Sequence, residues 1–143
     1  MVNKMLNKVH DHLSSELQQN TRTDTIFVVT AIIFNLIVLA INSAIASEAV
    51  SENANPANDL ILAVFIIMSI LVNGISVFAL QMGKKNRKKL IRGLLEMYKD
   101  NKVAKYYDKE LLSSYEKRYL LFTAIILCLA VTGIAVPLII RLV

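Results

Sequence analysis

Three long apolar runs constrain the fold of this chain more than any other feature. Each exceeds 20 residues, and none contains Asp, Glu, Lys, Arg or His: residues 26–46, 60–82 and 120–140. About 20 helical residues cross a hydrocarbon core of roughly 30 Å, and a helix in lipid satisfies its own backbone hydrogen bonds. A buried soluble core is the alternative, but a chain of 143 residues leaves too little polar sequence to cover three such runs. We therefore predict an all-α integral membrane protein, with three transmembrane helices in a single membrane domain, 1–143.

Charged residues are divided unevenly between the segments that join the predicted spans. The connection 47–59 carries only acidic charges, whereas the segment 83–119 carries twelve Lys or Arg side chains. Basic segments stay on the cytoplasmic side of a membrane under the positive-inside rule. The sequence thus predicts a multi-pass protein of the cell membrane, with a cytoplasmic N-terminus, an acidic outer loop at 47–59, a basic cytoplasmic segment at 83–119 and an outer C-terminus.

A dense basic cluster directly follows the second predicted span, in the stretch GKKNRKK that begins at Gly83. Basic clusters at a cytoplasmic membrane boundary hold anionic lipid headgroups, with about 1 kcal/mol for each side chain near the surface. A nucleic-acid patch is less favoured, because the segment lacks a recognisable nucleic-acid-binding motif and its position already accounts for its charge. We predict no nucleic-acid partner, and anionic-lipid contacts from Lys84, Lys85, Arg87, Lys88 and Lys89.

Apolar residues recur at helical spacing in both predicted cytoplasmic segments. In residues 1–20 the steps of four and three predict an amphipathic helix, which either lies in the membrane interface or packs on another cytoplasmic helix. The basic segment 83–119 is also predicted to be helical. Its pattern is interrupted by KDNK at 99–102, and a second helix is expected to start near Tyr106 and continue into the third span. The apolar stripe of the first helix consists of Val2, Leu6, Val9, Leu13 and Leu17.

Polar side chains inside the first two predicted spans form faces. Asn35 and Asn42 are seven residues apart and share one face of the first span, on a line of small or polar residues between Asp24 and Ala49. Asn35 lies at a similar depth to Asn73, so the two can meet. These residues either bond helices together, at roughly 0.6 kcal/mol per intramembrane hydrogen bond, or line a water-filled path. The face of the second span consists of Ser69, Asn73 and Ser76.

The third span presents small residues at steps of four and three along the helix. Small side chains let helix backbones approach closely, so this face is suited to packing. Its members are Ala124, Cys128, Thr132 and Ala135.

Motifs that carry chemistry are missing from the sequence. There is no glycine-rich phosphate loop, no metal-ligand spacing and no pattern of a nucleophile with its base. The single cysteine, Cys128, lies in an apolar run and cannot form a multi-cysteine metal site. We therefore expect no enzymatic activity, and no metal or cofactor.

Two functions fit these predictions. The first is a homo-oligomeric ion channel, because three spans of one copy cannot enclose a water-filled path and several copies would have to form a ring. Asn35 and Asn42 would then line the pore, and Glu48 and Glu52 at its outer mouth would favour cations. The second is a non-conducting accessory or scaffolding subunit of a larger membrane complex, in which the polar faces are packing seams. The uninterrupted polar line on the first span favours the channel.

Overall fold

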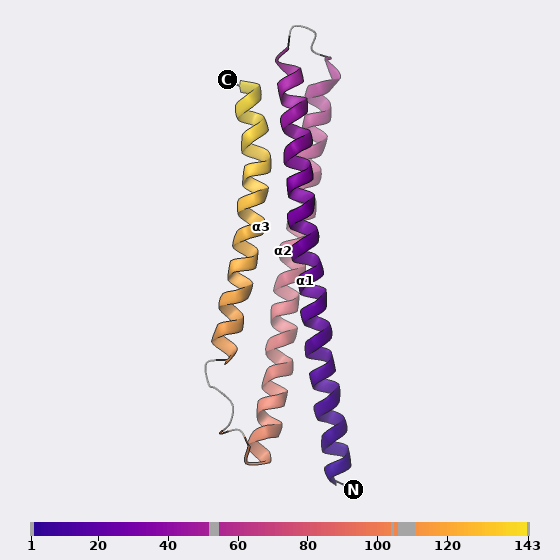
Figure 1. Cartoon of the computed structure of the whole chain (residues 1–143), viewed down its shortest axis with the longest axis vertical. Helices are drawn as coiled ribbons and strands as arrows, with labels where there is room; N and C mark the ends of the chain where they lie inside the picture. Colours follow the sequence, from indigo (N-terminus) through magenta and orange to yellow (C-terminus); the bar gives the residue numbers. More distant parts are fainter. Residues whose placement is uncertain (1, 52–54, 104, 106–110, 143) are drawn as a thin grey trace.

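The chain folds into three long helices that form one elongated bundle (Figure 1). The computed structural model describes residues 2–51, 55–103, 105 and 111–142. All three helices are long and apolar enough to cross a membrane, which confirms the predicted all-helical architecture with three candidate transmembrane helices. Their bounds are Val2–Ala49 for α1, Ala57–Asp100 for α2 and Leu111–Leu142 for α3.

The helices extend well beyond the apolar runs at one end of the bundle. With 48 and 44 residues, α1 and α2 are about 72 and 66 Å long, roughly twice the thickness of a hydrocarbon core. We call the end that holds the N-terminus and the basic segment the basic end, and the opposite end, which holds Glu48, the acidic end. Figure 1 shows α1 and α2 running further toward the basic end than α3 does.

The predicted amphipathic helix 1–20 and the first predicted span belong to one continuous helix, α1. No glycine or proline precedes Pro56 in the sequence, so nothing interrupts the helix between the two segments. The first part of α1 packs along α2 at the basic end, where His10 Nε2 lies 2.8 Å from the hydroxyl of Tyr98. This contact places the segment against α2.

The end of α2 coincides with the predicted interruption at 99–102. Lys102 adopts a left-handed conformation, with φ of 60°. The backbone N–H of Val103 donates to the carbonyl of Tyr98, and that of Lys102 donates to the carbonyl of Lys99, which is a Schellman motif. The second predicted helix start, near Tyr106, lies outside the described residues, and α3 is described from Leu111.

The antiparallel helices α1 and α2 keep one register along the bundle. In an antiparallel pair of helices, residues at the same level have residue numbers with a constant sum. This sum is 108 for Ile26, the first residue of one apolar run, and Met82, the last residue of the next. The same total describes three pairs joined by side-chain hydrogen bonds: His10–Tyr98, Thr21–Arg87 and Asn35–Asn73. Because the register does not slip, the two apolar runs end at the same level.

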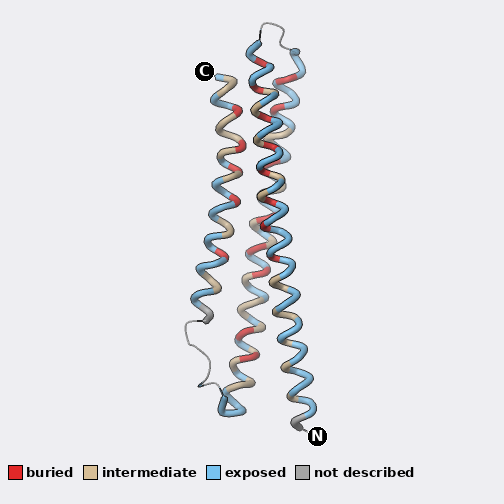
Figure 2. The backbone as a smooth tube through the Cα atoms, viewed as in Figure 1, coloured by how far each residue is buried: buried red, intermediate tan, exposed pale blue. Residues whose placement is uncertain are grey.

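Buried positions form one inward stripe on each helix (Figure 2). On α1 the steps between them are of four or three residues, close to the spacing of helices packed in a left-handed supercoil. The predicted polar line of the first span is therefore turned toward the other two helices. The buried residues of α1 are Asp24, Val28, Ala31, Asn35, Val38, Asn42, Ala46 and Ala49.

The small-residue face of the third span is not the side that packs inside the bundle. Ala124 and Cys128 are exposed, and Thr132 and Ala135 are only half-buried. This span is apolar on every side, so a stripe of small residues was no guide to which side meets the other helices. The buried stripe of α3 consists instead of Tyr119, Ile126, Ala130, Gly133 and Pro137.

Candidate functional site

The predicted intramembrane polar residues lie between the helices of a single copy. Asn35 and Asn73 are buried and form a reciprocal pair, in which each amide nitrogen donates to the oxygen of the other amide, at 2.8 and 2.9 Å. Each nitrogen also donates to a carbonyl of its own helix, that of Ala31 or Ser69, at 2.8 Å. Because an amide NH2 group has two donors, all the donors of this pair are used. The pair bonds α1 to α2 near the middle of their apolar runs.

The remaining predicted polar residues are buried along the same seam. The hydroxyl of Ser69 lies 3.3 Å from the Asn73 amide nitrogen, and the hydroxyl of Ser76 donates to a carbonyl of its own helix at 2.8 Å. Asn42 is fully buried, yet neither of its amide atoms has a hydrogen-bond partner among the described residues. The structure therefore brings Asn35, Asn73 and Ser69 together, and leaves Asn42 apart from them. We call the five predicted polar residues the polar seam: Asn35, Asn42, Ser69, Asn73 and Ser76.

Charges at the acidic end form an ion pair between α2 and α3. Arg141 of α3 donates two hydrogen bonds to the carboxylate of Asp59 at the start of α2, at 2.8 and 3.0 Å. These bonds lower the pKa of Asp59 below its usual value. Of the two residues predicted at an outer mouth, Glu48 is exposed, and Glu52 lies outside the described residues.

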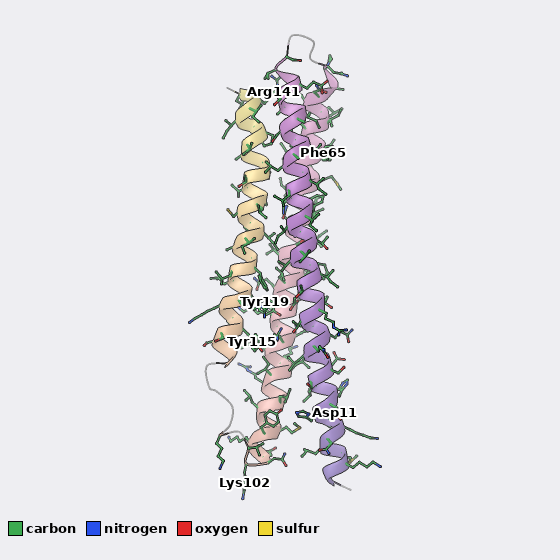
Figure 3. The ribbon with its side chains drawn as sticks, viewed as in Figure 1. Asp11, Phe65, Lys102, Tyr115, Tyr119 and Arg141 are labelled. Carbon is green, nitrogen blue, oxygen red and sulfur yellow. The ribbon has the colours of Figure 1, made fainter. Side chains whose placement is uncertain are left out.

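A buried carboxylate lies at the opposite boundary, where the apolar runs end toward the basic end. Asp24 of α1 is 6% exposed and accepts hydrogen bonds from the hydroxyl of Tyr119 on α3 and from the Asn20 amide, the latter at 3.2 Å. The Asn20 amide nitrogen also lies 3.2 Å from the carbonyl oxygen of Gly83 on α2. Figure 3 shows Tyr119 at this level of α3. All three helices meet here, and we call Asn20, Asp24, Gly83 and Tyr119 the carboxylate cluster.

Gly83 allows α2 to approach this carboxylate. A Cβ atom at position 83 would overlap a carboxyl oxygen of Asp24, because glycine alone leaves that space free. The Asp24 side chain is short and is held by Tyr119 and Asn20, so it has little freedom to move aside. The close approach is therefore a property of the glycine, and it fixes how α1 and α2 pack at this level.

Two arginines flank the carboxylate cluster. Arg87 and Arg118 line the same small pocket as Asp24. Arg87 donates to the hydroxyl of Thr21 at 2.8 Å, and its guanidinium carbon lies 4.1 Å from the centre of the Tyr115 ring. These positive charges offset part of the cost of burying a carboxylate, and the hydrogen bonds from Tyr119 and Asn20 offset more of it.

The five predicted lipid-contacting residues fall into two groups. Arg87 is engaged within the bundle, and Lys88 donates to Glu116 of α3 at 2.8 Å, a bond that lowers the pKa of Glu116 below its usual value. The other three residues form no ion pair with any described residue. Lys85 and Lys89 are exposed and Lys84 is half-buried. The cluster therefore leaves Lys85 and Lys89 most available to an outside anion.

The contacts of Asn20, Gly83, Tyr119 and Arg141 were not predicted from the sequence. The signal for the first three was present, because each lies within a few residues of a predicted span boundary at the basic end. A polar residue just outside a span is common, and only the register between helices shows that these three meet at Asp24.

The contacts of both polar regions bond the helices of one copy to one another. Asn35 and Asn73 join two helices at mid-depth, and the carboxylate cluster joins all three at the boundary. Within the described ranges, no group of three or more His, Cys, Asp or Glu side chains is placed to hold a metal ion. No protein-family model, curated protein or solved structure matches this chain.

Proposed function

We propose that the protein is a non-conducting accessory or scaffolding subunit of a larger membrane complex. The observation that carries this proposal is the reciprocal pair of Asn35 and Asn73, which is buried inside one copy. A channel built from a ring of copies needs these amides to face an axis between copies. In the bundle they face each other instead, and their donors are all used.

The outer surface of the bundle supports the same proposal. Between the two ends, it is dominated by large apolar side chains that would face lipid or an apolar surface of a partner. A ring of such copies would surround its axis with hydrocarbon, which does not hydrate an ion. Strongly exposed members are Ile33, Ile37, Ile67, Ile75, Phe78 and Val131.

Two measurements on the purified protein test the function. In detergent we expect a single copy or a mixture of sizes, because the partner that would define the assembly is absent. In planar bilayers we expect no current over a range of voltages, lipid compositions and membrane tensions. A particle of one uniform oligomeric size, together with a cation current that Asn35→Ala abolishes, would contradict the proposal and favour the channel.

The basic end is proposed to lie in the cytoplasm. The twelve basic residues of segment 83–119, against none in 47–59, support this orientation under the positive-inside rule. In a Cys128→Ser background, single cysteines at the exposed positions Ser51 and Lys102 are expected to react with a membrane-impermeant thiol reagent from opposite sides. Labelling of both positions from one side would overturn the three-span topology.

Exposed lysines at the basic end are proposed to hold anionic lipid. The pair Lys85→Gln and Lys89→Gln is expected to lower the preference for phosphatidylglycerol over phosphatidylcholine in mixed nanodiscs by roughly thirtyfold, given about 1 kcal/mol per basic side chain. The matched control is Lys99→Gln with Lys102→Gln, which removes the same charge well beyond the headgroup layer. An equal loss in both double variants would show that net charge, rather than a local contact, sets the preference.

A further inference from the structure

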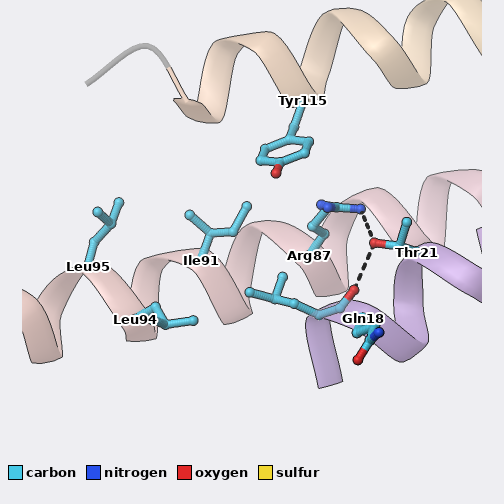
Figure 4. A pocket seen from close by; sticks show the side chains of 8 residues that line it. Gln18, Thr21, Arg87, Ile91, Leu94, Leu95 and Tyr115 are labelled. Carbon is cyan, nitrogen blue, oxygen red and sulfur yellow. Dashed lines mark hydrogen bonds between the residues drawn. The ribbon is translucent and has the colours of Figure 1, made fainter. Parts of the chain in front are cut away.

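A groove opens on the bundle at the basic end, beside the first described turns of α3 (Figure 4). It has a volume of about 240 Å³ and lies between α1, α2 and Tyr115. Its wall is apolar along most of its length, and Thr21 and Arg87 lie at the end nearer the membrane spans. The apolar wall consists of Leu17, Ile91, Leu94 and Leu95.

Arg87 gives this groove a positive end. Its guanidinium donates to Thr21 and stacks on Tyr115, but it forms no ion pair with a described carboxylate. Its Nε atom is buried and has no hydrogen-bond partner among the described residues. Although Arg87 offsets part of the Asp24 charge, it forms no direct ion pair with a described carboxylate, so its guanidinium makes this end of the groove attractive to an anionic group.

The direction of the groove's polarity excludes a membrane lipid as its occupant. Arg87 lies five residues beyond Met82, which places it about 7 Å from the hydrocarbon boundary and within the headgroup layer. Leu95 lies 13 residues beyond Met82, about 20 Å away, where the surroundings are aqueous. A lipid needs its apolar part nearer the membrane centre than its headgroup, and this groove has the opposite order.

Charge excludes a second copy of the chain and selects an acidic occupant. Residues 84–100 carry seven Lys or Arg against two acids, so the same segment of a second copy would bring like charge to the groove, and residues 1–20, with two Lys against two acids, would bring no net negative charge. A helix with a carboxylate and apolar residues on one face matches both the positive end and the apolar wall. We propose that this groove docks an acidic amphipathic helix of a partner protein, with a carboxylate on Arg87 and apolar side chains on Ile91, Leu94 and Leu95. The inference rests on the proposed accessory function.

A photo-crosslinking residue at Leu95, in membranes of the cells that make the protein, tests this docking. The expected product joins the chain to a second protein, and peptide sequencing should place the crosslink in a segment with acidic residues beside a helical apolar stripe. Gln18 lines the groove and is exposed, so Gln18→Glu should place a repelling carboxylate there without disturbing the core. We expect Gln18→Glu to lower the crosslink yield about tenfold and Gln18→Lys to leave it unchanged or raise it.

Arg87→Gln should lower the yield as well, with Lys99→Gln as the matched control at an exposed basic position outside the groove. A crosslink from Leu95 to its own chain, to a second copy or to lipid, a yield insensitive to Gln18→Glu, or no crosslink at all would overturn the docking proposal. A second crosslinker at Phe78, which is exposed on the apolar surface of α2, separates this failure from that of the accessory function. Capture of a defined partner at Phe78 but not at Leu95 would support the accessory function and contradict the docking of a partner helix in the groove.

Discussion

Replacement of Gly83 by alanine is expected to lower the free energy of unfolding by about 2–4 kcal/mol, a large effect for one added methyl group. The new Cβ would overlap the Asp24 carboxyl and push it away from Tyr119 and Asn20. Loss of hydrogen bonds to a buried carboxylate costs roughly 1.5–3 kcal/mol for each charged contact. Alanine is favoured over glycine inside a helix by about 0.5–1 kcal/mol. The substitution therefore destabilises the protein only because the cost of the clash exceeds this gain.

The matched control for this prediction is Gly93→Ala in the same helix and at the same end. A Cβ atom at position 93 would meet only a methyl group of Leu13 at 3.9 Å, which is an ordinary contact. The free energy of unfolding of each variant is measured by denaturant titration in detergent. We expect Gly93→Ala to leave it unchanged or to raise it. In an Asp24→Ala background, Gly83→Ala should cost much less, because the carboxyl it displaces is gone. A loss of the same size with and without Asp24 would show that the clash is not with this carboxylate.

The positions of the three spans were predictable from the sequence, but the ends of their helices were not. A change from apolar to charged residues marks where a helix leaves lipid, and residues such as Lys, Arg, Leu and Glu continue a helix equally well in water. Thr and Asp are weaker helix formers, yet α1 is continuous through Thr21 to Thr25, where the sequence suggested two separate segments. No glycine or proline interrupts the helix there, and Thr21 and Asp24 are held by contacts with the other two helices. At 99–102 the prediction of a helix end is confirmed, because there the local sequence changes and Lys102 turns the chain.

The inward face was predictable only where polar residues marked it. On α1 and α2 the asparagines and serines identified the buried side, because hydrocarbon excludes them from the outer surface. On α3, where every side is apolar, Ala124 and Cys128 are exposed while Gly133 and Pro137 are buried. The carboxylate cluster could not be predicted for a related reason. The meeting of Asp24 with Gly83 and Tyr119 depends on the register between three helices, which no local pattern encodes.

The second large effect is expected at the paired amides of the polar seam. Asn35→Ala should lower the free energy of unfolding by about 1–3 kcal/mol, because it leaves the buried Asn73 amide without its cross-helix partner. Asn73→Ala should have a similar effect for the same reason. Once either partner is gone, removing the other takes away an unpaired polar group. The double variant should therefore be less destabilised than the two single effects combined, by about 1 kcal/mol.

Asn42→Ala is the matched control, because Asn42 is an asparagine on the same buried stripe of α1 whose amide has no partner among the described residues. Its removal should change the free energy of unfolding by less than about 1 kcal/mol, since the small cavity it leaves is offset by the loss of an unsatisfied amide. Additive losses at Asn35 and Asn73, or a loss at Asn42 as large as that at Asn35, would show that the amides do not act as an interhelical pair. The polar seam would then not hold α1 and α2 together. The main argument against a channel, which is that Asn35 and Asn73 bond to each other within one copy, would then be lost.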